Sequence, residues 1–273
     1  MGDKSDSKYL HGYSDEEKAR LYRQARVLEH RVHGQLPFRR SRDIVEIGSG
    51  VGAQTEILLR HFPDLHVTCV ERSQEQIVAA ENHLGGMSWL QGRFNLVEED
   101  AMHLGFEQGR FDGAFLCWVL EHVPSPARVL SETRRILKPG SPIVCTEVIN
   151  SSFFINPYSP QTLKYWLAFN DHQIDIGGDP FVGSKLGNLL QSAGFRDIET
   201  EVRTFHFDNR APGERAEFLS FWTDLLLSGA PELLKKGRVS EETVDGMREE
   251  LDLVGRAPDS VFLYSFMRAV ATA

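Results

Sequence analysis

The chain alternates short apolar runs with segments in which apolar residues recur at helical spacing. Five runs have the composition of strands, at residues 44–47, 65–70, 93–97, 111–116 and 141–148. Helical spacing is found in the segments at 14–33, 54–62, 74–84 and 126–137. Strands that alternate with helices form parallel sheets with helices on both faces. The pattern therefore predicts an α/β fold with a doubly wound, mostly parallel sheet.

The last part of the chain departs from this alternation. An aromatic-rich insertion follows the fifth strand, and its middle is predicted to be a helix. A helix at 182–193 and a long strand at 195–207 come next. Residues 211–256 are largely helical, and residues 260–269 read as a final edge or antiparallel strand. We therefore predict a lid at 1–40, a core at 41–210 and 258–273 that contains the insertion 150–182, and a helical insertion at 211–257.

Three alternating glycines interrupt the pattern directly after the first strand. The stretch Glu46-x-Gly48-x-Gly50-x-Gly52 reads as strand, tight turn and helix start. Glycine allows positive φ and a close approach of a ligand to the backbone, and the helix that follows points its free N–H groups over the turn. The spacing Gly48-x-Gly50-x-x-Ala53 also fits a dinucleotide fingerprint. A carboxylate at Glu46, however, would repel a pyrophosphate and attract a cation.

With this acid, the glycine stretch resembles the first motif of the class I S-adenosylmethionine-dependent methyltransferases. The string VLEHVPSPARVLSETRRILKPGSPIV, which starts at Val119, resembles their ubiquinone/menaquinone-biosynthesis-like (type 11) small-molecule branch. The resemblance covers about residues 9–200. It implies a seven-stranded Rossmann-like sheet whose last two strands form a reversed hairpin, with helical insertions covering the active site. It also implies S-adenosylmethionine as cofactor and S-adenosylhomocysteine as product.

Positions that match the family carry the expected cofactor contacts. Glu71 ends the second strand, where an acid accepts hydrogen bonds from ribose hydroxyls. Asp100 is expected to meet the adenine amino group, with Glu99 as the competing choice. The segment HGYSDEEKARLYRQA resembles one bacterial subgroup, which implies Tyr13 and Tyr9 as lids over the methionine moiety; alternatively, a tyrosine here packs the first helix onto the domain. The full expected set is Tyr13, Glu46, Gly48, Ser49, Gly50, Gly52, Gln54, Thr55, Glu71, Arg72, Asp100, Ala101, Met102, Cys117 and Val119.

Methyl transfer needs alignment and exclusion of water, and a base only where the acceptor must lose a proton. His122 is the first choice of base, because it follows the fourth strand and imidazole titrates near neutral pH. A structural role for His122 is the alternative, and other candidate bases are Glu121, Glu147, Asp171, His172 and His206. The aromatic insertion follows a strand end, so we expect it to form a wall of the acceptor pocket. The predicted pocket residues are Tyr9, Glu121, Phe153, Phe154, Tyr165, Trp166 and Phe169.

Composition narrows the function further. The net charge of −9 argues against binding to nucleic-acid backbones. No metal is expected, since Cys69, Cys117 and Cys145 lack zinc-ligand spacing. No apolar run approaches the ~18 residues of a membrane span, and the polar N-terminal stretch lacks a signal-peptide core. A cytoplasmic enzyme with an apolar or aromatic small-molecule acceptor is therefore predicted, with a homodimer as one option. The alternatives are a nicotinamide-dependent oxidoreductase and a non-catalytic methyltransferase-like binding protein.

Overall fold

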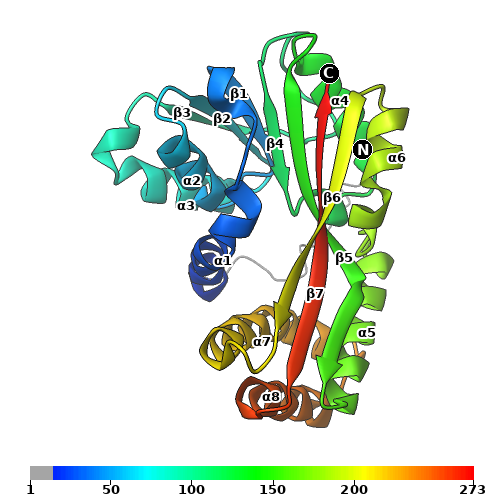
Figure 1. Cartoon of the computed structure of the whole chain (residues 1–273). Coiled ribbons are helices and arrows are strands. Elements are labelled where there is room, and N and C mark those ends of the chain that lie inside the picture. Colours follow the sequence, from blue (N-terminus) through cyan, green and yellow to red (C-terminus); the bar gives the residue numbers. More distant parts are fainter. Residues whose placement is uncertain (1–14) are drawn as a thin grey trace.

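The computed structural model describes residues 15–273 and contains one seven-stranded sheet in the order β3-β2-β1-β4-β5-β7-β6 (Figure 1). β7 runs antiparallel to both of its neighbours, and the other pairings are parallel. The strands are β1 (Asp43–Ile47), β2 (His66–Glu71), β3 (Phe94–Glu98), β4 (Ala114–Cys117), β5 (Pro142–Asn156), β6 (Arg196–Phe207) and β7 (Val261–Thr272). The predicted sheet and its reversed final hairpin are thus confirmed.

Helices cover both faces of the sheet. They are α1 (Asp15–His33), α2 (Ala53–His61), α3 (Gln74–Gly85), α4 (Pro126–Ile136), α5 (Pro160–Asp175), α6 (Leu186–Ser192), α7 (Pro212–Lys235) and α8 (Glu241–Arg256). Leu28 of α1 and Leu58 of α2 share a core with one face of the sheet. Leu130 of α4 and Leu190 of α6 share a second core with the other face. This arrangement is the predicted doubly wound fold.

Local sequence explains where several elements begin. The Ser73 hydroxyl accepts the backbone N–H of Gln76 at the start of α3, and Ser125 caps α4 through the N–H of Arg128. Pro126 stands in the first turn of α4, where its missing N–H costs nothing. The short strand β4 lies between β1 and β5 and is buried along most of its length, as its apolar run predicts.

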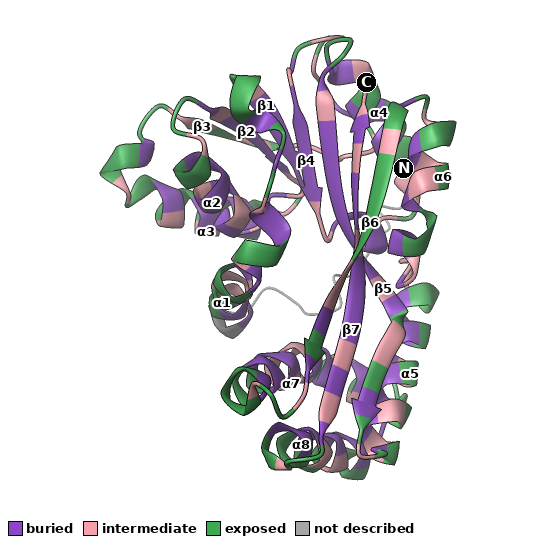
Figure 2. Ribbon diagram, viewed as in Figure 1, coloured by how far each residue is buried: buried purple, intermediate pink, exposed green. Residues whose placement is uncertain are grey.

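The strands β5, β6 and β7 are twice as long as the parallel strands or more, and they continue beyond them into a second lobe (Figure 1). β5 was expected to end near residue 148, yet it continues to Asn156 after an irregularity between Ile149 and Phe154. Residues 154–156 of the aromatic insertion therefore pair with β7 as a strand. α5, α7 and α8 pack around this extension, and Figure 2 shows its interior buried along β7.

Polar contacts fix the helical insertion to the sheet and to α1. The guanidinium of Arg215, on α7, is fully buried and donates to the carbonyl oxygens of Ser260 and Ala257, just before β7. Arg23 of α1 forms an ion pair with Asp224 of α7. α1 therefore lies beside both the parallel sheet and the second lobe.

Candidate active site

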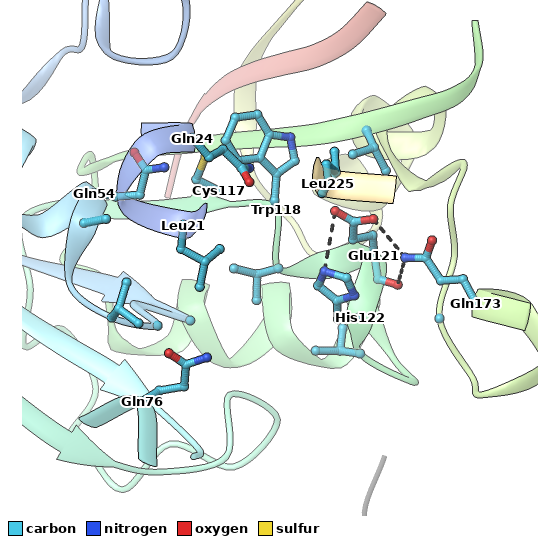
Figure 3. A pocket seen from close by; sticks show the side chains of 18 of the residues that line it. Leu21, Gln24, Gln54, Gln76, Cys117, Trp118, Glu121, His122, Gln173 and Leu225 are labelled. Carbon is cyan, nitrogen blue, oxygen red and sulfur yellow. Dashed lines mark hydrogen bonds and ion pairs between the residues drawn. The ribbon is translucent and has the colours of Figure 1, made fainter. Parts of the chain in front are cut away.

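A cavity of about 290 Å³ opens at the carboxyl ends of β1, β2 and β4 and extends between α1, α5 and α7 (Figure 3). Open α/β sheets bind ligands at this edge. The tyrosine hydroxyl of Tyr22, on α1, donates to the carbonyl oxygen of Val51, which holds α1 against the glycine turn. Leu21 and Gln24 of the same helix then face the cavity. The cavity thus joins the glycine turn to the second lobe.

The glycine turn has the geometry of a ligand cradle. Gly48 and Gly50 both have positive φ, of 71° and 54°. A Cβ on Gly48 would lie 2.5 Å from a methyl group of Val119, whereas a Cβ on Gly50 would meet no protein atom within 4 Å. Three buried polar atoms around the turn have no hydrogen-bond partner, and all belong to residues that line the cavity: Ser49 Oγ, Gln54 Oε1 and Gln76 Oε1. The space over Gly50 and these three atoms fit a polar ligand.

Glu71 faces the same end of the cavity. One oxygen of its carboxylate accepts the backbone N–H of Gly50 at 3.0 Å, and the other accepts those of Arg72 and Ser73 at 2.8 and 2.9 Å. The carboxylate therefore ties the end of β2 to the glycine turn. The oxygen that accepts from Gly50 keeps a lone pair for a further donor, such as a ribose hydroxyl.

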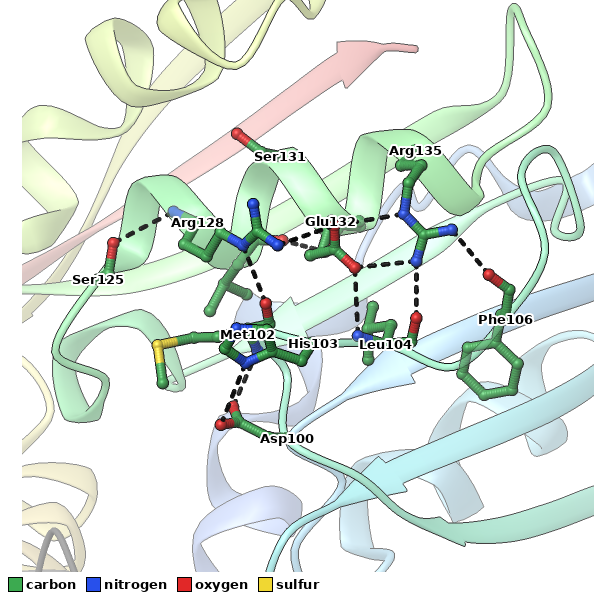
Figure 4. A network of polar contacts seen from close by, with 12 residues as sticks. Asp100, Met102, His103, Leu104, Phe106, Ser125, Arg128, Ser131, Glu132 and Arg135 are labelled. Carbon is green, nitrogen blue, oxygen red and sulfur yellow. Dashed lines mark hydrogen bonds and ion pairs between the residues drawn. The ribbon is translucent and has the colours of Figure 1, made fainter. Parts of the chain in front are cut away.

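The loop after β3 brings Asp100, Ala101 and Met102 to the cavity, as predicted, together with Glu99. The Asp100 carboxylate accepts the backbone N–H of Met102 at 2.9 Å. Figure 4 shows how α4 holds this loop: Arg128 donates to the carbonyl of Met102, and Arg135 donates to those of Leu104 and Phe106. The α4 carboxylate of Glu132 accepts from both Arg135 and the N–H of Leu104. The loop after β3 is therefore positioned by two arginines outside the cavity wall.

The end of β4 supplies Cys117, Trp118 and Val119 to the cavity wall. Trp118 has a φ of 55°, which is unusual for a residue with a side chain. Fully buried Glu147 accepts the N–H groups of Val119 and Leu120 at 3.0 and 2.8 Å. Backbone strain of this kind persists where the surroundings fix it. Glu147 therefore holds the turn that directs Trp118 into the cavity.

Glu121 and His122 follow this turn and line the deeper part of the cavity (Figure 3). His122 Nε2 lies 3.6 Å from one carboxylate oxygen of Glu121, and Gln173 Nε2 donates to the other at 2.8 Å. Glu121 is buried, so its charge depends on these polar neighbours. The carboxylate is placed to orient the imidazole.

Aromatic side chains from distant segments enclose the deep end. Trp166 and Phe169 of α5 lie parallel, with ring centroids 5.7 Å apart. Trp222 of α7 lies 5.7 Å from Trp166 and 4.6 Å from Tyr264 of β7. Further walls come from Phe205, Phe218, Phe221, Leu225 and Leu226. The cavity therefore changes from a polar end at the glycine turn to an aromatic end in the second lobe.

Some predicted cofactor residues lie behind the turn and not in the cavity wall. The Glu46 side chain is only 2% exposed and accepts the Thr55 hydroxyl at 2.6 Å. Burial raises the pKa of Glu46 to about 8. The hydrogen bond from Thr55 lowers this pKa, and the charge of Glu71 raises it, but both effects are smaller than that of burial. Gly52 faces Leu84 of α3. The predicted direct contact between Glu46 and a cationic ligand is therefore not supported; Glu46 anchors the start of α2.

Other predictions also need correction. The buried Glu147 carboxylate is held by backbone N–H groups and does not reach the cavity, so it does not fit a base. His172 is buried on α5 outside the cavity wall, and burial lowers its pKa. Tyr165 is fully buried, with its hydroxyl on the carbonyl of Leu226, and Phe153 packs against Trp222. Phe154 is 52% exposed, because neighbours on β5 face opposite sides.

Among the predicted positions, Tyr9 and Tyr13 lie outside the described residues. The cavity wall includes Gly48, Ser49, Gly50, Gln54, Glu71, Arg72, Asp100, Ala101, Met102, Cys117, Val119, Glu121, His122, Trp166 and Phe169. Sequence reasoning missed Trp118, Gln173 and the wall from β7. It expected helical insertions over the active site, and the aromatic spacing of α7 marked an apolar face, but it named no α7 residue of the cavity wall.

Residues 15–273 contain neither a metal-binding cluster nor a membrane-spanning helix. No cluster of three His, Cys, Asp or Glu side chains could hold a metal ion there. No helix in this range is long and apolar enough to cross a membrane. Burial raises the pKa of the Cys117 thiol well above its ordinary value, so this cavity residue stays a neutral thiol.

Residues 45–145 match a family model described as a methyltransferase domain. The chain is 30% identical over 162 residues to the O-methyltransferase cnsE of Penicillium expansum, an alignment covering 59% of this chain and 54% of that protein. It is 29% identical over 203 residues to the demethylmenaquinone methyltransferase of Staphylococcus aureus, covering 67% and 79%. The chain thus spans about half the length of the Penicillium relative.

The fold resembles that of Haemonchus contortus phosphoethanolamine N-methyltransferase 2 in complex with S-adenosylhomocysteine. The TM-score is 0.56 at 19% identity, covering 92% of this chain and 52% of that one. With the strand order, the glycine turn and the matched segment, these likenesses identify the class. Residues 45–145 form a methyltransferase domain, and the relatives and the fold support a class I S-adenosylmethionine-dependent methyltransferase. This confirms the family expected from the sequence.

Proposed function

We propose that this chain transfers a methyl group from S-adenosylmethionine to a small-molecule acceptor with an apolar or aromatic body. The observation that carries the proposal is the continuous cavity, polar at the glycine turn and aromatic in the second lobe. The names of the two curated relatives support a small-molecule acceptor, since one is called an O-methyltransferase and the other acts on demethylmenaquinone. The net charge of −9 disfavours a nucleic acid.

The polar end fits the cofactor. Ser49, Gln54 and Gln76 offer unpartnered polar atoms, and Gly50 leaves room for a close approach to the backbone. We assign Glu71 to the ribose hydroxyls and Asp100 to the adenine amino group. When bound, S-adenosylmethionine supplies a methyl group on a positively charged sulfur, which leaves as a neutral thioether. The enclosed cavity excludes water from the acceptor atom, and its walls align that atom for in-line displacement.

Residues at the boundary between the two ends would handle the proton. We assign His122 as the base that accepts the proton of a hydroxyl or amine acceptor. The Glu121 carboxylate orients this imidazole and stabilises its charge once protonated, while Gln173 holds Glu121 in place. A positioned base contributes about 10²- to 10⁴-fold in rate.

Two further segments of the chain are assigned to the two ends of the cavity. We propose that residues 1–40 act as a lid on the cofactor end and that residues 211–257 roof the acceptor end, since α1 and α7 both line the cavity. A cytoplasmic location and a homodimer remain predictions.

Transfer of a labelled methyl group tests the proposal. The protein is incubated with methyl-labelled S-adenosylmethionine and a cell extract separated into a small-molecule filtrate and retained macromolecules. Label should appear in a small-molecule product that chromatography separates from S-adenosylmethionine, and transferred label confined to the macromolecules would contradict the small-molecule assignment. His122→Ala should bind S-adenosylhomocysteine normally while turnover falls by about 100-fold or more. Unchanged turnover in this variant would remove His122 as the base.

A further inference from the structure

The charge distribution of the cavity is uneven. Among the described lining residues, the guanidinium groups belong to Arg20 and Arg72. Arg20 is paired with the Glu17 carboxylate at 2.6 Å, and Arg72 stands next to Glu71 at the cofactor end. The aromatic end contains the buried carboxylate of Glu121, and the fully buried Glu147 lies close enough that the charge of Glu121 helps burial to raise the pKa of Glu147. While His122 is neutral, as a base must be, an anionic group in the aromatic end would therefore meet the charge of Glu121 without a neutralising cation among the described lining residues.

Two buried, unpartnered polar atoms belong to side chains that line the aromatic end, and they indicate which groups a ligand must carry there. Gln173 is almost fully buried; its Nε2 is bound to Glu121, but its Oε1 accepts no hydrogen bond. Trp222 is also buried, and its Nε1–H has no acceptor. A buried polar group without a partner is costly, so each one favours a ligand that satisfies it. Gln173 requires a donor such as a hydroxyl, and Trp222 requires an acceptor oxygen.

The shape of the aromatic end adds a third requirement. Trp166, Phe169, Trp222 and Tyr264 form a continuous wall in which each ring supports the next. Such surfaces favour flat apolar ligands through stacking and edge contacts. The wall is joined to α5, α7 and β7, so its shape is set by three separate elements.

We propose that the acceptor is an uncharged, planar aromatic molecule that carries at least one hydroxyl and one further oxygen, and that the pocket rejects carboxylates and phosphate esters. The inference rests on the proposed function and specifies the acceptor of that same site. Rejection is as important as attraction, because specificity is a difference between two affinities. Glu121 therefore acts as a charge filter in addition to its contact with His122.

A matched pair of probes tests the charge filter. Hydroxynaphthaldehyde is neutral and has the required hydroxyl and oxygen, whereas the corresponding hydroxynaphthoate adds a carboxylate to the same ring system. Both are titrated into protein saturated with S-adenosylhomocysteine, and quenching of tryptophan fluorescence is followed, because Trp118, Trp166 and Trp222 line the cavity. The aldehyde should bind at least about tenfold more tightly than the naphthoate. Equal or tighter binding of the naphthoate would overturn the proposal.

Two variants assign the result to particular atoms. Glu121→Gln should strengthen naphthoate binding and so reduce the difference in affinity between the aldehyde and the naphthoate. An unchanged difference in this variant would contradict the role of Glu121 as a charge filter. Trp222→Phe keeps a ring but removes the Nε1 donor, and should weaken aldehyde binding by about fivefold. Trp89→Phe is the matched control, since Trp89 is 45% exposed and outside the cavity wall. Equal effects of the two tryptophan substitutions would contradict the role of Nε1.

The cofactor titration separates this inference from the proposed function. If S-adenosylhomocysteine binds and neither probe does, the aromatic acceptor is wrong while the cofactor assignment stands. If S-adenosylhomocysteine itself does not bind, the proposed function fails first.

Discussion

The two ends of the cavity are built in different ways. The cofactor end comes from short segments that each follow a strand of the parallel sheet, such as the turn after β1 and the loop after β3. The acceptor end combines α5, α7 and the extended strands β6 and β7, which are far apart in the chain. A local turn can be recognised from its residues, whereas a wall assembled from distant elements depends on the whole fold. Single substitutions at the cofactor end are therefore predicted to have large effects. At the acceptor end, smaller effects should be spread over many residues.

The largest effect is expected from Gly48→Ala. The new Cβ would lie 2.5 Å from the Val119 Cγ2 methyl, and the residue would be strained at a φ of 71°. The affinity for S-adenosylhomocysteine should fall by about 100-fold in calorimetric titration. Adding Val119→Ala removes both Val119 methyl groups and should restore about tenfold of this loss. No restoration would mean that the turn fails for a reason other than this contact.

Gly50→Ala should have a smaller effect of a different kind. A methyl group here touches no protein atom, so only strain from its φ of 54° and occlusion of the ligand are expected. The affinity for S-adenosylhomocysteine should fall about tenfold. Gly92→Ala is the control, because Gly92 also has positive φ and open space but lies outside the cavity wall. The Gly92→Ala variant should lose about as much thermal stability as Gly50→Ala but keep its affinity for S-adenosylhomocysteine. Equal losses of affinity in the two variants would argue against a ligand over Gly50.

Glu147 links the two ends, and its ionisation should appear as a pH dependence of stability. Burial, with the charge of Glu121, raises its pKa to about 8 from an ordinary 4.5. A raised pKa in the folded state means that this group's contribution is complete below 4.5 and is lost as the pH rises toward 8. Glu147→Gln keeps an acceptor for the N–H groups of Val119 and Leu120 but does not titrate. The free energy of unfolding in urea should therefore rise for the variant, relative to the unsubstituted protein, between a pH of about 5 and a pH of about 8. Parallel stability curves would contradict this ionisation.

The smallest effect is expected from Arg135→Ala, which acts on the cofactor end from outside. The loss of donors to Leu104 and Phe106 should loosen the loop that contains Asp100 and lower cofactor affinity about threefold. Arg110→Ala, which removes a half-exposed arginine outside the cavity wall, should not change cofactor affinity. An equal loss in both variants would mean that the effect is one of net charge.

These differences also explain how much the sequence could predict. The glycine turn, Glu71 and the Asp100 loop were predicted because each is a short segment with its own chemistry. Glu46 and Glu147 were misassigned, since the same residue type at a strand end can face a ligand or a buried backbone N–H. Trp118 was missed because its positive φ is imposed by neighbours distant in the chain. A helical insertion was expected over the active site, but the α7 residues of the wall could not be named, because helical spacing identifies an apolar face and not the residues that this face meets.

The most direct test is a calorimetric titration of the protein with S-adenosylmethionine, S-adenosylhomocysteine and NADH in parallel. The unpartnered atoms at the glycine turn and the free space over Gly50 predict that both adenosyl ligands bind, with dissociation constants on the order of micromolar. NADH should not bind. Binding of NADH alone would contradict the account and move the site to the nicotinamide-dependent oxidoreductases.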